Sequence, residues 1–158
     1  MPEIEIVKEQ LKRHEGLAKW NKTKTLIVPY TDSRGYLTIG YGICIDSFKG
    51  GLTLEECETL LKMRIDKMVA EINRDKHLSP IYKKCNTYRK AVLINMAFNM
   101  GLGTYGSNDG LLGFKNTLAY IKAGDYEQAS VNMLQSLWAK QVKGRANELA
   151  KIMKNGYA

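Results

Sequence analysis

Cysteine and histidine are both scarce in this sequence. The 158 residues hold three cysteines, Cys44, Cys57 and Cys85, and no two of them form a C-x-x-C pair. A disulfide framework or a structural zinc site needs paired or clustered cysteines, so neither is indicated. The two histidines, His14 and His77, are too few to suggest a metal cluster. We therefore expect reduced, mostly packed thiols and no metal or other cofactor.

Long hydrophobic runs are also missing. No apolar stretch approaches the roughly 20 residues that span a bilayer. The N-terminus, Met-Pro-Glu-Ile-Glu-Ile, is acidic where a secretion signal would be basic and then apolar. These features predict synthesis in a cytoplasm and no stable insertion in a membrane.

Acidic residues are outnumbered by basic ones. The chain has 24 Lys and Arg against 16 Asp and Glu, for a formal net charge of +8. Its content of 44% hydrophobic and 25% charged residues is that of an ordinary globular protein. The excess positive charge favours anionic partners, either nucleic acid or a bacterial envelope, without choosing between them.

Periodicity and turn signals divide the chain into segments of different character. Apolar residues at helical spacing predict a helix over about residues 3–14 that stops at Gly16. From Thr25 to Asp46, β-branched and aromatic residues alternate around the turn signal at residues 32–35, which predicts a small hairpin or meander. A capping box at Thr53-Leu54-Glu55-Glu56 then starts a long helix.

The segment order predicts an α+β architecture. A small β-containing N-terminal lobe covers about residues 15–52, and the linking helix covers about residues 53–73. Everything from about residue 74 to residue 158 reads as helical and forms the C-terminal lobe, to which helix 3–14 is assigned.

Two carboxyl groups are candidates for chemistry on a glycosidic bond, which needs one proton donor and one ionised partner. Glu15, at the end of an apolar-faced helix, suits the donor, which requires partial burial. Asp32 opens a polar turn and suits the charged partner, and the Thr38 hydroxyl is placed to hold a water against it. Without further information, a solvated glutamate and a turn-forming aspartate explain the same residues more simply.

Two motifs resemble the catalytic signature of the phage T4-type lysozymes, glycoside hydrolase family 24. The first is Arg-His-Glu-Gly-Leu at residues 13–17, and the second is Tyr-Thr-Asp-Ser-Arg-Gly-Tyr-Leu-Thr-Ile-Gly-Tyr-Gly at residues 30–42. In that family a Glu is followed by an Asp or Cys, five residues, a Thr and a Thr-Ile-Gly-x-Gly strand. The similarity continues over residues 91–101, 113–118 and 138–146, so it spans nearly the whole chain.

The resemblance implies an endolysin with muramidase activity on the β-1,4 bond between N-acetylmuramic acid and N-acetylglucosamine. Glu15 resembles the family's general acid, Asp32 its second carboxylate and Thr38 the residue that positions the hydrolytic water. The substrate-binding residues implied in the same way are Asn99, Arg145 and Tyr30, with Arg145 pairing with the acid. Trp138 matches an aromatic residue packed beneath the cleft, and its helical surroundings favour a core position over a sugar platform.

The resemblance also implies partners and a site of action. Peptidoglycan is the expected substrate of a monomeric enzyme, made in the host bacterial cytoplasm. Release to the periplasm and cell wall then requires a separate holin-type partner, because the chain shows no export signal. The resulting protein is bacteriolytic and antimicrobial, and it does not bind nucleic acid.

One departure from the family pattern concerns the spacing of the two carboxyls. Sixteen residues separate Glu15 from Asp32, where the family usually has eight. We therefore interpret Trp20–Pro29 as an insertion, either an added strand or a longer cleft lip.

Two other functions stay open from the sequence. One is a lysozyme-like protein that binds peptidoglycan without cutting it, because the insertion displaces Asp32. The other is a basic nucleic-acid-binding domain, for which only the charge speaks, since no helix-turn-helix, zinc-finger or RNA-binding signature occurs.

Overall fold

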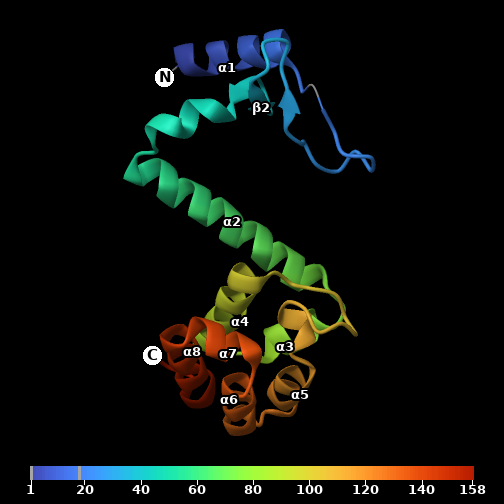
Figure 1. Ribbon diagram of the computed structural model, residues 1–158, viewed down its shortest axis with the longest axis vertical. Coiled ribbons are helices and arrows are strands. Elements are labelled where there is room, and N and C mark those ends of the chain that lie inside the picture. Colours follow the sequence, from blue (N-terminus) through green and yellow to red (C-terminus); the bar gives the residue numbers. More distant parts are fainter. Residues whose placement is uncertain (1, 18) are drawn as a thin grey trace. The chain divides into compact units, whose positions relative to one another are not determined.

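The computed structural model describes residues 2–17 and 19–158 (Figure 1). The chain divides into two compact units, Met1–Cys57 and Glu58–Ala158, and each is described by itself. The protein is mostly helical with one small antiparallel sheet, so the predicted α+β class is confirmed. The predicted lobes, including the assignment of helix 3–14 to the C-terminal lobe, stay a prediction.

The N-terminal unit begins with helix α1 (Pro2–Glu15). It ends where predicted, because Gly16 has a φ of 62° and its N–H donates to the carbonyl of Lys12 at 3.1 Å. A left-handed residue after the last helical one is the usual helix stop, and glycine adopts it without steric cost.

The sheet of this unit is a three-stranded meander. Its strands are β1 (Tyr30–Thr31), β2 (Leu37–Ile39) and β3 (Ile43–Cys44), paired antiparallel in the order β1-β2-β3. The prediction of a hairpin or meander between residues 25 and 46 is thus confirmed. The 3₁₀ helix η1 (Ile45–Gly50) that follows was not predicted.

The insertion Trp20–Pro29 forms a hairpin-like loop without a regular strand. Trp20 and Ile27 make an isolated antiparallel bridge. Inside the loop the Asn21 side-chain oxygen accepts hydrogen bonds from the N–H groups of Thr25 at 2.9 Å and Leu26 at 3.2 Å. The alternative of an added strand is therefore wrong, because a single bridge and an Asn-centred turn replace a ladder of backbone pairs.

Helix α2 (Leu54–Arg74) carries the predicted capping box in full. The Thr53 hydroxyl accepts from the Glu56 N–H at 3.2 Å, and the Glu56 carboxylate accepts from the Thr53 N–H at 2.7 Å. Two backbone donors that a helix N-terminus leaves without partners are satisfied in this way.

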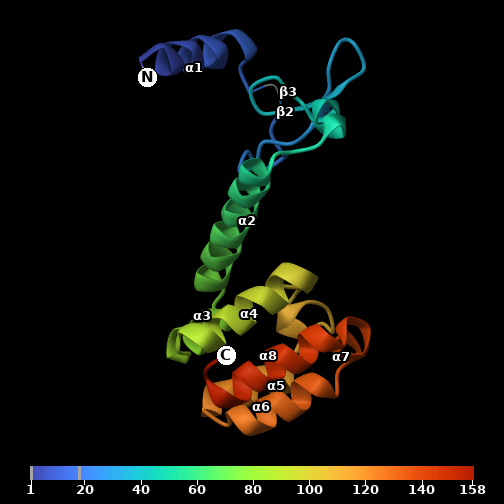
Figure 2. The ribbon, with the colours of Figure 1, turned by 90° about the vertical axis from the view of Figure 1, so that its left-hand side faces the viewer.

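The C-terminal unit consists of helices joined by loops and contains no strand (Figure 2). Helix α6 packs against both α5 and α8, and α8 also contacts α4 and α7. The elements that follow α2 are α3 (Leu78–Lys84), α4 (Thr87–Met100), η2 (Leu111–Gly113), α5 (Lys115–Ala123), α6 (Tyr126–Leu134), α7 (Leu137–Val142) and α8 (Gly144–Asn155).

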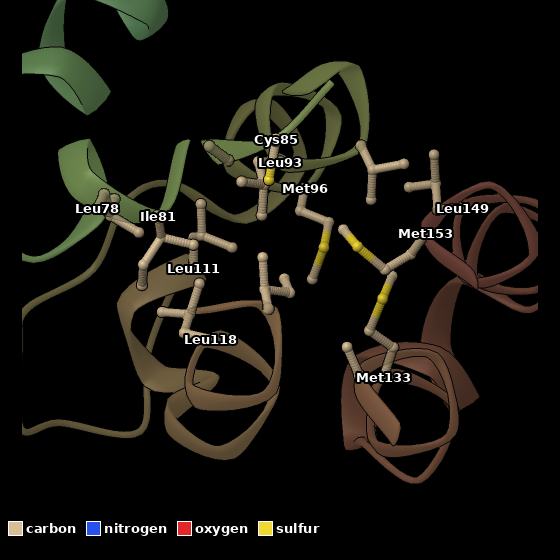
Figure 3. Close-up of a cluster of buried hydrophobic side chains, with 14 of the residues drawn as sticks. Leu78, Ile81, Cys85, Leu93, Met96, Leu111, Leu118, Met133, Leu149 and Met153 are labelled. Atoms are coloured by element: carbon tan, nitrogen blue, oxygen red, sulfur yellow. The ribbon is translucent and has the colours of Figure 1, made fainter. Parts of the chain in front are cut away.

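The core of this unit is assembled from side chains far apart in the sequence (Figure 3). Met96 of α4, Met133 of α6 and Met153 of α8 are completely buried and meet at its centre. Unbranched methionine side chains fill the irregular space where helices cross, so these helices share one hydrophobic core.

The three cysteines are all free, and they differ in burial. Cys85 is buried within the core, and burial raises the pKa of its thiol above the ordinary value of 9.0. Cys44 is half-buried and Cys57 is exposed on α2. The expectation of mostly packed thiols is thus wrong for Cys57, which occupies a helix position that faces solvent.

Arg89 ties α4 to the end of α8. Its Nε donates to the carbonyl of Met153 at 2.8 Å, and Nη2 donates to the carbonyl of Lys154 at 3.0 Å. The guanidinium also lies 3.5 Å above the ring of Tyr126. These contacts satisfy carbonyls that the C-terminus of a helix leaves open and add a cation–π contact to α6.

In the part of the chain that the structure describes, no helix combines the length and the apolar character needed to cross a membrane.

Candidate active site

Glu15 is the last residue of α1, and its carboxyl group lies against the backbone of Gly42. A Cβ atom placed on Gly42 would be 2.6 Å from Oε2 and 2.8 Å from Cδ of Glu15. Gly42 also has a φ of 71°, in the left-handed region. The absence of a side chain at this position is what lets the carboxyl approach.

The partial burial expected of a proton donor is not observed at Glu15. Its side chain is exposed, because it stands at the helix end where the chain turns away at Gly16. The residue is thus positioned by its contact with Gly42 and not by enclosure.

Asp32 is held by the turn that it opens. Its Oδ1 accepts hydrogen bonds from the N–H groups of Arg34 and Tyr36, each at 2.9 Å. The other oxygen, Oδ2, lies 3.9 Å from Nε of Arg34. With two backbone N–H donors on one oxygen and partial burial, the group has a polar, hydrogen-bonded setting. The turn is held through Oδ1, so the turn-forming role does not exclude the catalytic role predicted for this residue.

Thr38 and Tyr30 face each other across the sheet. They are register partners in β2 and β1, and Tyr30 is half-buried. The Thr38 side chain is only 3% exposed, and its hydroxyl donates to the carbonyl of Tyr36 at 3.1 Å. With its proton used in this way, the oxygen is left to act as an acceptor.

Asn99 and Trp138 form a hydrogen-bonded pair in the C-terminal unit. The indole N–H of Trp138 donates to Oδ1 of Asn99 at 2.8 Å. The indole is 7% exposed and meets the ring of Phe114 edge to face, with centroids 5.9 Å apart. The prediction that Trp138 is a packed aromatic is confirmed. The bond fixes the amide of Asn99 so that its NH₂ group is the end available to a ligand.

A cavity of about 520 Å³ opens beside this pair. Its wall carries several amide and hydroxyl groups, a lining that suits a ligand rich in hydroxyls. Sequence analysis missed it, because the polar residues come from three separate segments; they include Asn108, Asn116, Asn132, Gln135, Ser136 and Gln141.

Arg145 lies in the first turn of α8 and is exposed. It lines a different cavity of about 420 Å³, whose other walls include Ile65, Ile94 and Phe98. Its guanidinium is therefore a single charge at the edge of a mostly apolar hollow.

The predicted site residues thus fall into two groups. Glu15, Asp32, Thr38 and Tyr30 belong to the unit Met1–Cys57, whereas Asn99 and Arg145 belong to Glu58–Ala158. Gly42 was not singled out as a site residue, although the Thr-Ile-Gly-Tyr-Gly motif contains it. Among residues 2–17 and 19–158, no three His, Cys, Asp or Glu side chains gather as metal ligands would.

Fold and site together define a lysozyme-like protein: two carboxylates in a small β-containing unit and a polar cavity in a helical one. Comparison with known families agrees, because the model of the family described as phage lysozyme matches residues 25–154. The chain belongs to the phage lysozyme family.

The chain is also similar in sequence to individual proteins. The chain is 30% identical over 171 residues to the pre-baseplate central spike protein Gp5 of Enterobacteria phage T4, covering 94% of this chain and 27% of Gp5. It is 26% identical over 177 residues to probable T4-type lysozyme 1 of Dictyostelium discoideum, covering 97% of this chain and 96% of the relative. Probable T4-type lysozyme 2 of the same organism is 26% identical over 119 residues, covering 75% of this chain and 66% of the relative.

The comparisons confirm the predicted family and, with it, the enzyme class of a lysozyme. The chain spans about a quarter of the length of Gp5 and nearly all of lysozyme 1. The range matched by the family model contains Asp32, Thr38, Asn99 and Arg145, while Glu15 precedes it.

Proposed function

We propose that this protein is a muramidase that hydrolyses the β-1,4 bond between N-acetylmuramic acid and N-acetylglucosamine in peptidoglycan. The observation that carries the proposal is the seating of the Glu15 carboxyl on Gly42, between β2 and β3 of the same meander in which Asp32 opens the turn between β1 and β2. One compact unit thereby supplies both carboxyls that glycoside hydrolysis needs.

In this mechanism Glu15 protonates the oxygen of the leaving sugar. A water, activated by Asp32 and held by Thr38, attacks the anomeric carbon. Oδ2 of Asp32 is the oxygen for this role, because Oδ1 is engaged by two backbone N–H groups. A separation of about 6.5–9.5 Å between the carboxyls leaves room for the water and gives inversion at the anomeric carbon.

Sugar binding is assigned to Asn99, Arg145 and Tyr30. The Asn99 amide suits a hydroxyl or acetamido oxygen, because its own oxygen is bonded to Trp138 and its NH₂ group is the donor that remains. Arg145 supplies a positive charge and is assigned as the partner of the acid. Tyr30 lies opposite Thr38 in the sheet and is assigned to the sugar beside the water.

In the cell we propose an endolysin role, in which a monomer lyses the host bacterium. The enzyme is made in the host cytoplasm and reaches the periplasm and wall through a separate holin-type partner. The net charge of +8 supports this role, because it concentrates the enzyme on an anionic envelope.

The first test is Glu15→Gln, with Glu9→Gln as the matched control. Both residues lie on α1 and both changes remove one negative charge. Loss of the general acid lowers the rate of clearing of chloroform-treated Gram-negative cells by about 10²–10⁴-fold, whereas the control retains the parental rate. Clearing at the parental rate by Glu15→Gln would contradict the assignment.

The products give a second test. Mass spectrometry of the released fragments should show reducing ends at muramic acid, and anhydro-muramic ends would instead indicate a lytic transglycosylase. The anomer formed during cleavage should be inverted; net retention would reject direct attack by water. A parent protein that sediments with peptidoglycan but releases no fragment would establish the non-catalytic binding alternative.

A further inference from the structure

A groove in the C-terminal unit, additional to the two cavities described above, lies between α3 and α5, which pack against each other. It encloses about 280 Å³. The segment before α3 and the loop that contains Tyr105 complete its walls. None of the residues assigned above to catalysis or sugar binding lines it.

The floor of the groove is apolar. It is formed by Ile81, Leu112 and Leu118, which are 6%, 3% and 6% exposed. Figure 3 shows that Ile81 and Leu118 are rooted in the hydrophobic core. The floor is therefore fixed in place before any ligand arrives.

Three lysines stand around this floor. Lys115 and Lys122 lie seven residues apart on α5, which places them two turns apart on one face of the helix. Lys76 approaches from the segment before α3. No acidic residue is among the described residues that line the groove. The neighbouring carboxylate of Asp75 accepts hydrogen bonds from the backbone N–H groups of His77 and Leu78 at 2.8 and 2.9 Å. The groove thus gathers positive charge that suits an anion with more than one negative charge.

A stacked aromatic pair closes one side of the groove. The rings of His77 and Tyr105 are parallel to within 2°, with centroids 3.5 Å apart. The tyrosine remains 61% exposed despite this contact. A bare inorganic ion gains nothing from an aromatic ring and an apolar floor, whereas a ligand with an apolar ring face beside its charge can use both.

We propose that this groove binds a phosphorylated sugar, such as a phosphate-bearing unit of an envelope glycan. The lysines contact the phosphate, and the C–H face of the pyranose lies on the apolar floor beside Tyr105. Nucleic acid is disfavoured, because it is usually bound along an extended basic track with repeated phosphate contacts, while this charge surrounds one small hollow.

The test uses three probes: glucose 6-phosphate, glucose and inorganic phosphate, each titrated while backbone amide resonances are recorded. Glucose 6-phosphate should shift the amide resonances of residues 76–79, 81 and 115–122. It should bind at least about tenfold more tightly than either of the other probes. Equal affinity for glucose 6-phosphate and inorganic phosphate would overturn the sugar assignment.

Variants localise the binding. Lys76→Gln combined with Lys122→Gln should weaken glucose 6-phosphate binding about tenfold or more. The matched control combines Lys83→Gln with Lys151→Gln. Both of these lysines are also exposed, and they lie outside the groove. Lys115 is left unchanged, because it also lines the 520 Å³ cavity. If both double variants weakened glucose 6-phosphate binding equally, the loss would reflect net charge alone, and the proposal would be overturned.

Three further measurements distinguish a sugar-phosphate site from a simple phosphate site, from part of the peptidoglycan site and from a nucleic-acid site. Tyr105→Ala should weaken binding of glucose 6-phosphate and leave binding of inorganic phosphate unchanged. The Lys76 and Lys122 variant should retain the parental rate of peptidoglycan hydrolysis, and loss of that rate would assign the groove to the substrate site instead. Displacement of glucose 6-phosphate by duplex DNA at about 150 mM salt would favour a nucleic-acid site and equally overturn the proposal.

Discussion

Gly42 is the residue on which the placement of Glu15 depends. The Glu15 carboxyl occupies the space where any other residue at position 42 would carry its Cβ. Gly40, two residues earlier, has a similar backbone, with a φ of 63°, but a Cβ there would meet no atom within 4 Å. The two glycines therefore share a conformational requirement and differ in the space around them.

We predict that Gly42→Ala lowers muramidase activity far more than Gly40→Ala. Both variants force an alanine into left-handed backbone, at a cost of roughly 1–2 kcal/mol of stability each. Only Gly42→Ala also displaces the carboxyl of Glu15, and a shift of about 1 Å in a catalytic group costs on the order of 10²-fold in rate. The comparison requires kcat on soluble peptidoglycan fragments together with the melting temperature of each variant. Equal activity of the two variants would show that the contact with Glu15 has no catalytic importance.

At the scale of secondary-structure elements, the ends of helices are the features that the sequence predicts best. The stop at Gly16 and the capping box at Thr53 are both observed: Gly16 is left-handed, with a φ of 62°, and the Glu56 carboxylate accepts from the Thr53 N–H at 2.7 Å. Such ends are decided by contacts within four residues, so they can be read locally.

Site geometry depends on longer distances and was predicted less well. The turn signal at residues 32–35 indicated a hairpin or meander, and the structure adds its register, which pairs Tyr30 with Thr38. The contact between Glu15 and Gly42 and the bond between Asn99 and Trp138 join separate segments, and no periodicity encodes them. The resemblance to a family supplied the identities of the candidate residues, while their contacts came from the structure.

At the scale of one helix, we predict that Glu56→Ala lowers the free energy of unfolding by about 1 kcal/mol, whereas Glu55→Ala changes it little. Both residues lie in the first turn of α2, and both changes remove the same charge. Only Glu56 reaches back to the Thr53 N–H, at 2.7 Å. Urea unfolding followed by circular dichroism measures the difference. Equal losses from the two variants would mean that helix-dipole charge, not the capping box, stabilises this end.

At the scale of the whole molecule, burial is distributed unevenly. All of the buried hydrophobic side chains among the described residues lie between Ile72 and Met153, within the unit Glu58–Ala158. Among residues 2, 4–6, 8–17 and 19–57, the only buried side chain is that of Thr38. Hydrophobic burial is the main source of folding stability. The unit that holds the proposed carboxyls therefore gains little stability from burial of its own side chains. Low local stability is common in regions that bind ligands.

We therefore predict that the N-terminal unit opens at a lower free energy than the C-terminal unit. The amides of Asp32 and Leu118 make a matched pair, because each donates to a backbone carbonyl at 2.9 Å. Because the two hydrogen bonds have the same length, a difference between the native-state hydrogen-exchange rates of the two amides reports how easily the structure around each one opens. We expect the Asp32 amide to exchange with an opening free energy at least about 2 kcal/mol lower, and with little dependence on urea, while Leu118 tracks global unfolding. The same free energy and urea dependence at both amides would show that the whole chain unfolds as one cooperative unit, and the uneven burial would then not set the order of opening.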